Sequence, residues 1–327
     1  MADPDDETVL HYTVGTPPSV WDELSLPPPH VDREYQGPFV ANTTATRFTV
    51  GPFVTEIGEG TFSGCSRLSS LQGMGGGVTS IGERAFCQSG LVTLQGMGEN
   101  VTAIGTGAFY KCEALTSLRG IPESVTVISL QAFANCTSLT SLEGLPDSLA
   151  AIGSSSDRGV FGCCTGLTSL QGLSKNITEI GRDCFRWCFG MTSLQGGENV
   201  TALGSGAFHS CDALTTLQGL SRNVTAIGDP DSFSSIGAFQ SCTSLVSIGP
   251  GFSPGCFVDP DTFDDCPALL AAAEAKGFST AIEWGRHHWL AVPRRRFTVV
   301  TAVHQVRFHP PSLTPPLPAP LPPRWRA

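Results

Sequence analysis

The sequence predicts a repeat solenoid of about nine coils, each 23–24 residues long. A phenylalanine recurs nine times, and six of the eight gaps between its copies are 23 or 24 residues. Around it recur an Ile-Gly pair, a cysteine three residues later and a Leu-x-x-Leu motif. Because so short a unit cannot bury its apolar residues alone, stacked copies must share one continuous core. The recurring phenylalanines are Phe62, Phe86, Phe109, Phe133, Phe161, Phe185, Phe208, Phe239 and Phe263.

One copy, Val101–Leu118, shows the elements expected in each coil. It reads "VTAIGTGAFYKCEALTSL", and no single helical or strand period fits its apolar residues. The segments "VTAI" and "LTSL" are rich in Val, Ile and Thr and predict strands. The segment "AFYKC" predicts one short helical turn, and Gly105 and Gly120 predict bends. Two insertions, Gly153–Val160 and Gly228–Gly237, are rich in Ser, Gly and Asp and predict surface loops.

The two ends differ in composition from the repeats. Residues 1–45 hold two proline clusters and are predicted to be a mobile segment. Residues 46–283 are predicted to form the solenoid, with "RFTVGPFV" as an N-terminal cap strand and Cys266–Trp284 as a C-terminal cap helix, because solenoid ends expose apolar surface. Residues 284–327 carry seven Arg, no acidic residue and many prolines, which predicts a basic, extended tail.

The motifs "SIGERAF", "AIGTGAFYKC", "EIGRDCFRWC" and "ALGSGAFHSC" are each followed by Leu-x-x-Leu. In these residues, from about Val54 to Leu270, the chain resembles the BspA-like (Treponema pallidum type) leucine-rich repeats. The resemblance implies a right-handed solenoid with one parallel strand per coil. It also implies a binding or adhesion protein, since known members share no catalytic site. The chain departs from that family in reading "LTSLQGL", with Gly where an aliphatic residue is common.

The charge distribution argues against several classes of function. The formal net charge is −10, and up to Glu283 there are 29 acidic residues against 12 basic ones. Such an acidic body argues against nucleic-acid binding, which needs a basic surface. No run of 18 apolar residues exists, so no membrane span is expected. The start "MADPDDETVLHY" lacks the pattern of a secretory signal, which predicts a cytosolic protein, or a surface protein if the N-terminus is incomplete. We expect a monomer.

The cysteines form a column three residues after the repeated phenylalanine. We interpret them as small buried apolar residues, and the spacing of coils disfavours disulfides between them. Cys184 and Cys188 lack the paired pattern of a zinc site, so we expect no metal and no cofactor. A catalytic thiol needs a base, and His209 is the only histidine within the repeats, so we expect no catalytic residue. The column comprises Cys65, Cys112, Cys136, Cys164, Cys188, Cys211, Cys242 and Cys266, with Ser89 in the remaining copy.

Two columns of threonine run along the array. One follows the first aliphatic residue of each coil, from Thr55 to Thr225, with Ala150 as its exception. The other lies in the "LTSL" segments and is our candidate partner-binding face, although threonine is also simply a good residue for a solvated strand. Exposed aromatic and Arg residues, which mark binding hot spots, are few, the best being Tyr110, Arg186 and Trp187. The candidate face comprises Thr116, Thr140, Thr168, Thr192 and Thr215.

These features predict a non-enzymatic protein–protein interaction module that acts in the cytosol on an unidentified protein partner. The alternative is a cell-surface adhesin that binds glycan or a host protein. Six Asn-x-Ser/Thr triplets would suit a glycosylated surface protein. Four of them, however, fall at one repeat position, where Asn suits a turn and Thr belongs to a column. These four are Asn100, Asn176, Asn199 and Asn223.

Overall fold

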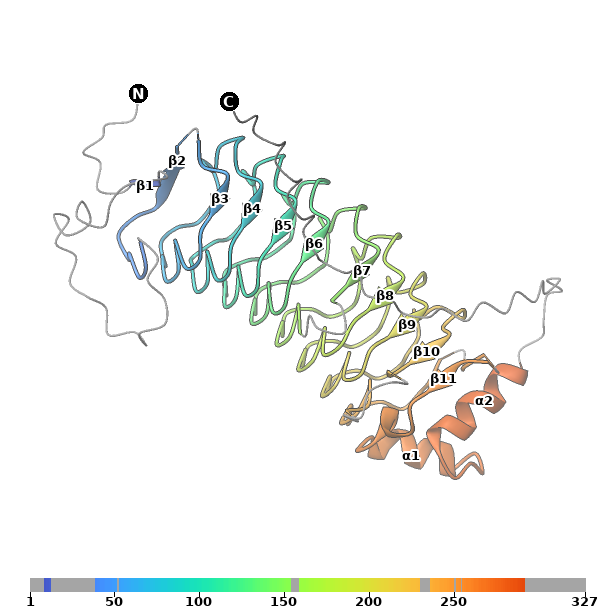
Figure 1. Ribbon diagram of the computed structural model, residues 1–327. Coiled ribbons are helices and arrows are strands. Elements are labelled where there is room, and N and C mark those ends of the chain that lie inside the picture. Colours follow the sequence, from blue (N-terminus) through green and yellow to red (C-terminus); the bar gives the residue numbers. More distant parts are fainter. Residues whose placement is uncertain are drawn as a thin grey trace, which may run out of the picture. The chain divides into compact units, whose positions relative to one another are not determined.

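The computed structural model describes residues 9–12, 39–51, 53–153, 159–229, 236–249, 251–253 and 255–291. Figure 1 shows a succession of similar coils, each contributing a short strand, closed at one end by two helices. The strands of the array are β3 (Glu56–Ile57), β4 (Ser80–Ile81), β5 (Ala103–Ile104), β6 (Val127–Ile128), β7 (Ala151–Ile152), β8 (Glu179–Ile180), β9 (Ala202–Leu203), β10 (Ala226–Ile227) and β11 (Phe257–Val258).

The strands pair in parallel from coil to coil. Each buried aliphatic residue is paired with its equivalent in the next coil, as Ile57 is with Ile81 and Ile81 with Ile104. Strands β3–β6 form one sheet and β7–β11 another, and the division falls in the coil where Ala150 interrupts the threonine column. The "VTAI" segments are therefore the strands of the array. The predicted solenoid of leucine-rich-repeat type is confirmed.

The prediction of a second strand at "LTSL" is wrong for most coils. Among the described residues these segments form only an isolated bridge, between Thr216 and Ser247. Their amides do pair across coils, but in alternating directions: the Thr116 N–H donates to Val92 of the coil before, and the Leu118 N–H to Glu143 of the coil after. The chain bends within two residues after each "LTSL" segment, so the paired stretch is too short to form a strand.

The predicted helical turn at "AFYKC" is instead a series of separate turns. Gly107 and Lys111 both have positive φ, 58° and 56°. A left-handed residue reverses the direction of the next peptide, so alternate amides point along the solenoid axis rather than into a helix. The Phe109 N–H accordingly donates to Ala132 of the next coil, whereas the Tyr110 N–H bonds locally to Gly107.

The core is a continuous stack of phenyl rings, one from each coil. Neighbouring rings have centroids 5.2–5.7 Å apart and planes inclined by 4–14°. Offset stacking of this kind stabilises beyond the burial of area. The stack begins at Phe39, which lies 23 residues before Phe62 and is buried. Coil packing therefore begins at Phe39, within the segment that the sequence analysis set apart as residues 1–45.

Both ends of the array are covered. At the N-terminal end, β2 (Arg47–Val50) lies in the predicted cap segment and pairs in parallel with β1 (Val9–Tyr12). At the other end a 3-10 helix, η3 (Pro260–Phe263), leads into α1 (Pro267–Glu274) and α2 (Ala281–Ala291).

The single cap helix predicted over Cys266–Trp284 is two helices, because Gly277 has φ +83° between them. Helix α2 also extends beyond residue 283, where the sequence predicted the solenoid to end. Trp284 is buried, and Gly285 lies so close to the Phe252 ring that a Cβ there would overlap it. The rest of the proline-rich tail, residues 292–327, and most of both predicted loops lie outside the described residues.

Candidate interaction surface

The five threonines of the candidate face lie in one exposed column. All of Thr116, Thr140, Thr168, Thr192 and Thr215 are exposed. Backbone hydrogen bonds join neighbouring coils at this position, as from Thr140 N–H to Thr116 O (3.4 Å) and from Thr192 N–H to Thr168 O (2.9 Å). The structure thus brings together every residue that the sequence placed on this face.

Four of the five hydroxyls in this column already use their protons. Thr192 Oγ1 donates to Thr168 O at 3.2 Å, and Thr215 Oγ1 donates to Thr192 O at 3.3 Å. Thr116 and Thr140 make the same bond at 3.4 and 3.5 Å. A hydroxyl that donates inward keeps its lone pairs for solvent. The face therefore offers a partner methyl groups and hydrogen-bond acceptors.

Two valines extend the column at its ends. Val92 and Val246 occupy the threonine position in their coils and are 45% and 48% exposed. Val92 O accepts from Thr116 N–H, and Val246 N–H donates to Thr215 O. A search for threonine missed both, although the motifs "LVTL" and "LVSI" keep the Leu-x-x-Leu register.

The other threonine column has similar chemistry. Thr79 Oγ1 donates to Thr55 O at 3.0 Å, and Thr102 Oγ1 donates to Thr79 O at 3.1 Å. Its members are also largely exposed. Hydroxyl chemistry alone therefore does not distinguish the two columns, and this second one provides matched control positions.

The glycine that departs from the usual repeat has a structural cause. In seven coils it has φ between +89° and +109°, a conformation that L side chains rarely adopt. At Gly120 a Cβ would lie 2.5 Å from Leu94 C and 2.7 Å from Gln95 N. Glycine thus lets the chain turn sharply after each "LTSL" while lying against the previous coil. The seven are Gly73, Gly96, Gly120, Gly144, Gly172, Gly196 and Gly219.

The cysteine column is buried, as predicted, and each thiol also makes a hydrogen bond. Cys112 Sγ donates to Phe86 O at 3.2 Å, and Cys136 Sγ donates to Phe109 O at 3.3 Å, in each case in the coil before. The other column cysteines repeat this bond. Cysteine therefore combines the size of a small apolar residue with a donor for the phenylalanine carbonyl.

Burial keeps the column thiols protonated. Desolvation raises the pKa of Cys112 and of Cys164 to about 12, and it raises the pKa of Cys184 and Cys188 as well. A thiolate is the reactive form of cysteine, so these thiols are poor nucleophiles at neutral pH. Within the described part of the chain, no group of three or more His, Cys, Asp or Glu residues is placed to hold a metal ion.

Mild alkylation of the folded protein should modify Cys163 first. Cys163 is half-buried, whereas the other cysteines are buried. Burial raises its pKa, and the nearby Arg186 partly offsets this. Peptide mass mapping after brief exposure to iodoacetamide would give the order of modification. Labelling of Cys184 or Cys188 as fast as Cys163 would contradict this account and revive a catalytic role for a thiol.

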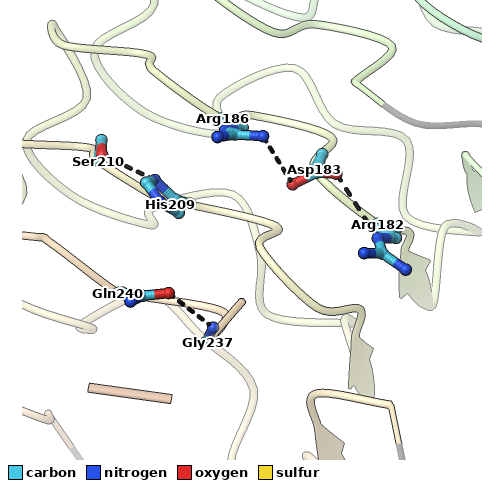
Figure 2. Close-up of polar contacts among 7 residues, drawn as sticks. All are labelled: Arg182, Asp183, Arg186, His209, Ser210, Gly237 and Gln240. Carbon is cyan, nitrogen blue, oxygen red and sulfur yellow. Dashed lines mark hydrogen bonds and ion pairs between the residues drawn. The ribbon is translucent and has the colours of Figure 1, made fainter. Parts of the chain in front are cut away.

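A cluster of charged and polar side chains lies in the coils of Phe185 and Phe208. Figure 2 shows Asp183 between Arg182 and Arg186, with His209 and Ser210 in the next coil. The buried Asp183 carboxylate is 3.6 Å from Arg182 Nε and 3.9 Å from Arg186 Nη1. Ser210 Oγ and His209 Nδ1 are 2.7 Å apart. Desolvation lowers the pKa of His209, and the charge of Arg186 lowers it further.

The structure brings together two of the three predicted hot-spot residues. The Arg186 guanidinium lies 3.9 Å from the centre of the Trp187 ring, and Trp187 is 40% exposed. Tyr110 is three coils away, where the ammonium of Lys111 lies 5.7 Å from its ring.

The repeat motif, the parallel strands and the stacked phenylalanines agree with a comparison against protein families. A family model described as the BspA type leucine rich repeat region, in six copies, matches residues 36–156 and 157–251. The chain belongs to the BspA-type leucine-rich repeat family. Repeats and solenoids of this type are typically non-enzymatic and occur in protein-binding or surface proteins. No curated protein matched the chain.

Solved structures of leucine-rich repeat proteins resemble this BspA-type chain. A leucine-rich cell surface protein from Faecalibacterium prausnitzii is 26% identical over 63% of each chain, with a TM-score of 0.38, so the match spans less than two thirds of that protein. A protein from Bacteroides ovatus is 24% identical over 71% of this chain and 73% of its own, with a TM-score of 0.38. The T. pallidum leucine-rich repeat protein is 24% identical over 47% of this chain and 68% of its own, with a TM-score of 0.39.

A search of the described residues of this BspA-type chain found no helix that is long and apolar enough to cross a membrane.

Proposed function

We propose that this protein is a non-enzymatic interaction module that presents its "LTSL" face to a partner protein. The observation that carries the proposal is the single exposed column from Val92 to Val246, with Thr116, Thr140, Thr168, Thr192 and Thr215 between them. Backbone hydrogen bonds join the members from Val92 to Thr140 and from Thr168 to Val246, so little side-chain or loop entropy is lost on binding. A rigid face of methyl groups and hydrogen-bond acceptors can pack against a protein surface that carries hydrogen-bond donors.

The length of this face supports a protein partner. Seven coils contribute to it when Ser69 is left out. With hydrogen-bonded strands about 4.8 Å apart, six steps between coils span about 29 Å. A stable interface needs about 800 Å² from each partner, which a face of this length and about 28 Å of width would supply.

We also propose that the protein acts in the cytosol as a monomer. All twelve cysteines are free thiols, which suits a reducing compartment. Two of the repeat-position asparagines, Asn100 and Asn176, use their side-chain N–H groups to bond backbone carbonyls of Gly76 and Asp147. The intact mass of the native protein should match the bare chain, and added glycan would place it outside the cell.

Arginine substitutions on the candidate face should abolish partner capture. The double variant Thr140→Arg, Thr168→Arg places two long cations on the column, which would prevent close packing. We expect at least tenfold weaker capture, the loss typical of disrupting a hot region of an interface. Affinity capture from an extract of the native cells, quantified by mass spectrometry, gives the measurement.

The matched control is Thr126→Arg, on the other threonine column. Thr126 is exposed and its hydroxyl donates to Thr102 O, as on the candidate face. It should capture the partner normally, and all variants should melt like the parent protein. Equal capture by the double variant and the parent would refute the assignment of this face.

A surface adhesin is the second candidate function. The observation that favours it is the row of hydroxyl acceptors, which could receive hydrogen bonds from sugar hydroxyls. Binding to a glycan array that is lost in the double variant, without capture of any protein, would favour this alternative.

A further inference from the structure

The coil that contains Phe185 departs from the repeat at exposed positions. Trp187 and Phe189 are 40% and 48% exposed. In other coils the position of Trp187 holds small or polar residues such as Gly64, Asn135 and Ser210. The core does not require these changes, because Phe185 itself stacks as its equivalents do.

Trp187 occupies an unfavourable backbone conformation. Its φ is +61°, and the equivalent residues in other coils are left-handed too, so the fold sets this conformation. A bulky residue is an outlier there, whereas Gly and Asn are well tolerated. Strained residues of this kind collect at functional sites. An exposed tryptophan thus stands where stability alone would favour a small residue.

Arg186 is held in place with hydrogen-bonding capacity to spare. One face of its guanidinium lies against the Trp187 ring at 3.9 Å, and its Nη1 is 3.9 Å from Asp183 Oδ1. That separation permits attraction but exceeds hydrogen-bond length. Its Nε is buried and has no hydrogen-bond partner among the described residues, so a ligand can reach the guanidinium only through its Nη groups. The planar fork of arginine matches a carboxylate, to which it can donate two parallel bonds.

Two arginines lie close together on an acidic chain. Arg182 and Arg186 flank the carboxylate of Asp183 (Figure 2), and the charge of Asp212 acts on His209 in the next coil. Burial and the charge of Arg186 lower the pKa of His209, so it adds little positive charge at neutral pH. Up to Glu283 the chain has 29 acidic and 12 basic residues, so a pair of neighbouring arginines stands out. The partly exposed guanidinium of Arg186 attracts an acidic partner segment and sets its position.

We propose that Arg186, Trp187 and Phe189 form a docking site for an acidic peptide segment of a partner protein. A carboxylate of the segment bonds the Arg186 fork, and a neighbouring apolar side chain packs on the two exposed rings. Exposed Trp and Arg are the residue types that dominate binding energy at interfaces. This inference deepens the proposed function and rests on it, because it names the chemistry of the partner.

The test uses fluorescein-labelled pools of nine-residue peptides and the full chain. In one pool a central Leu, Phe or Tyr is flanked by Asp and Glu, and in the matched pool by Asn and Gln. Fluorescence polarisation should show binding of the acidic pool at least about tenfold tighter than the amide pool. Higher salt should weaken binding of the acidic pool, because partly exposed charges are screened.

Two variants and two matched controls locate the site. Arg186→Gln and Trp187→Asn should each weaken binding of the acidic pool by about fivefold or more. Arg222→Gln removes an exposed arginine elsewhere, and Phe53→Asn removes an aromatic residue that is 89% exposed. Both controls should bind like the parent protein. Equal binding of the two pools, or equal losses in variants and controls, would overturn the inference.

A melting curve separates docking from a purely structural role. Trp187→Asn relieves the left-handed strain, so its melting temperature should equal or exceed that of the parent protein. A lower melting temperature would mean that Trp187 serves packing, and the inference would fall. If the threonine face captures a partner while the acidic pool does not bind, this inference fails and the proposed function stands.

Discussion

Replacing Phe133 by alanine should destabilise the solenoid by about 3–5 kcal/mol, the usual cost of emptying a buried aromatic site. Phe133 is fully buried between two other rings of the stack. Its centroid is 5.2 Å from that of Phe109 and 5.6 Å from that of Phe161. The substitution would interrupt the one core that all coils share. Urea unfolding followed by circular dichroism gives the change in unfolding free energy.

The matched control is Phe53→Ala. Phe53 is 89% exposed, so its loss should change stability by no more than about 0.5 kcal/mol. In a repeat array each coil contacts only its neighbours. A second unfolding step in Phe133→Ala would mean that the coils before and after Phe133 unfold separately. An effect of Phe133→Ala as small as that of the control would show that the stack does not hold the coils together.

Gly120→Ala should cost about 2–5 kcal/mol, from backbone strain and overpacking together. Gly120 has φ +109°, and a Cβ would lie 2.5 Å from Leu94 C in the coil before. The positive φ and the overlap with Leu94 both involve backbone atoms, so no side chain can move aside to relieve them. The coil would have to shift, and with it the adjacent Thr116 of the candidate face. Thermal unfolding with partner capture as a second readout measures both effects.

Gly76→Ala is the control for this substitution. Nothing lies within 4 Å of a Cβ built there, and its φ is not positive. Alanine should therefore be neutral or stabilise slightly, because it reduces the entropy of the unfolded chain. If Gly120→Ala were equally harmless, the conformation assigned to the glycine column would be wrong.

The repeat and its core could be predicted from the sequence because their signal is local and repeated. Phenylalanine, cysteine and Leu-x-x-Leu recur in fixed register, and each lies where stacking requires it. Phe39 escaped detection because its copy, "FVANTTATRF", has Asn42 in the cysteine position and lacks the Leu-x-x-Leu motif. Its stacking on Phe62 and the hydrogen bond from Cys65 Sγ to Phe39 O show that it belongs to the array.

The features that could not be predicted depend on contacts between coils. The segment "AFYKC" favours a helical turn by itself, but left-handed residues such as Lys111 turn alternate amides toward the next coil. The segment "LTSL" has strand composition, but the glycine that follows it ends the pairing. The sequence also pointed to Arg186 and Trp187 separately. Their stacking, and the buried carboxylate of Asp183 beside them, emerge only when the coil is folded.

The most direct test of the central claim is photo-crosslinking from the "LTSL" face. Thr140 would be replaced by benzoylphenylalanine in the full chain, expressed in its native cells, with the same replacement at Thr126 as the matched position. We expect irradiation to join Thr140 to one protein, identified by mass spectrometry, and Thr126 to none. Crosslinks of equal yield from both positions, or none from Thr140, would contradict the assignment of this face as the protein-binding surface.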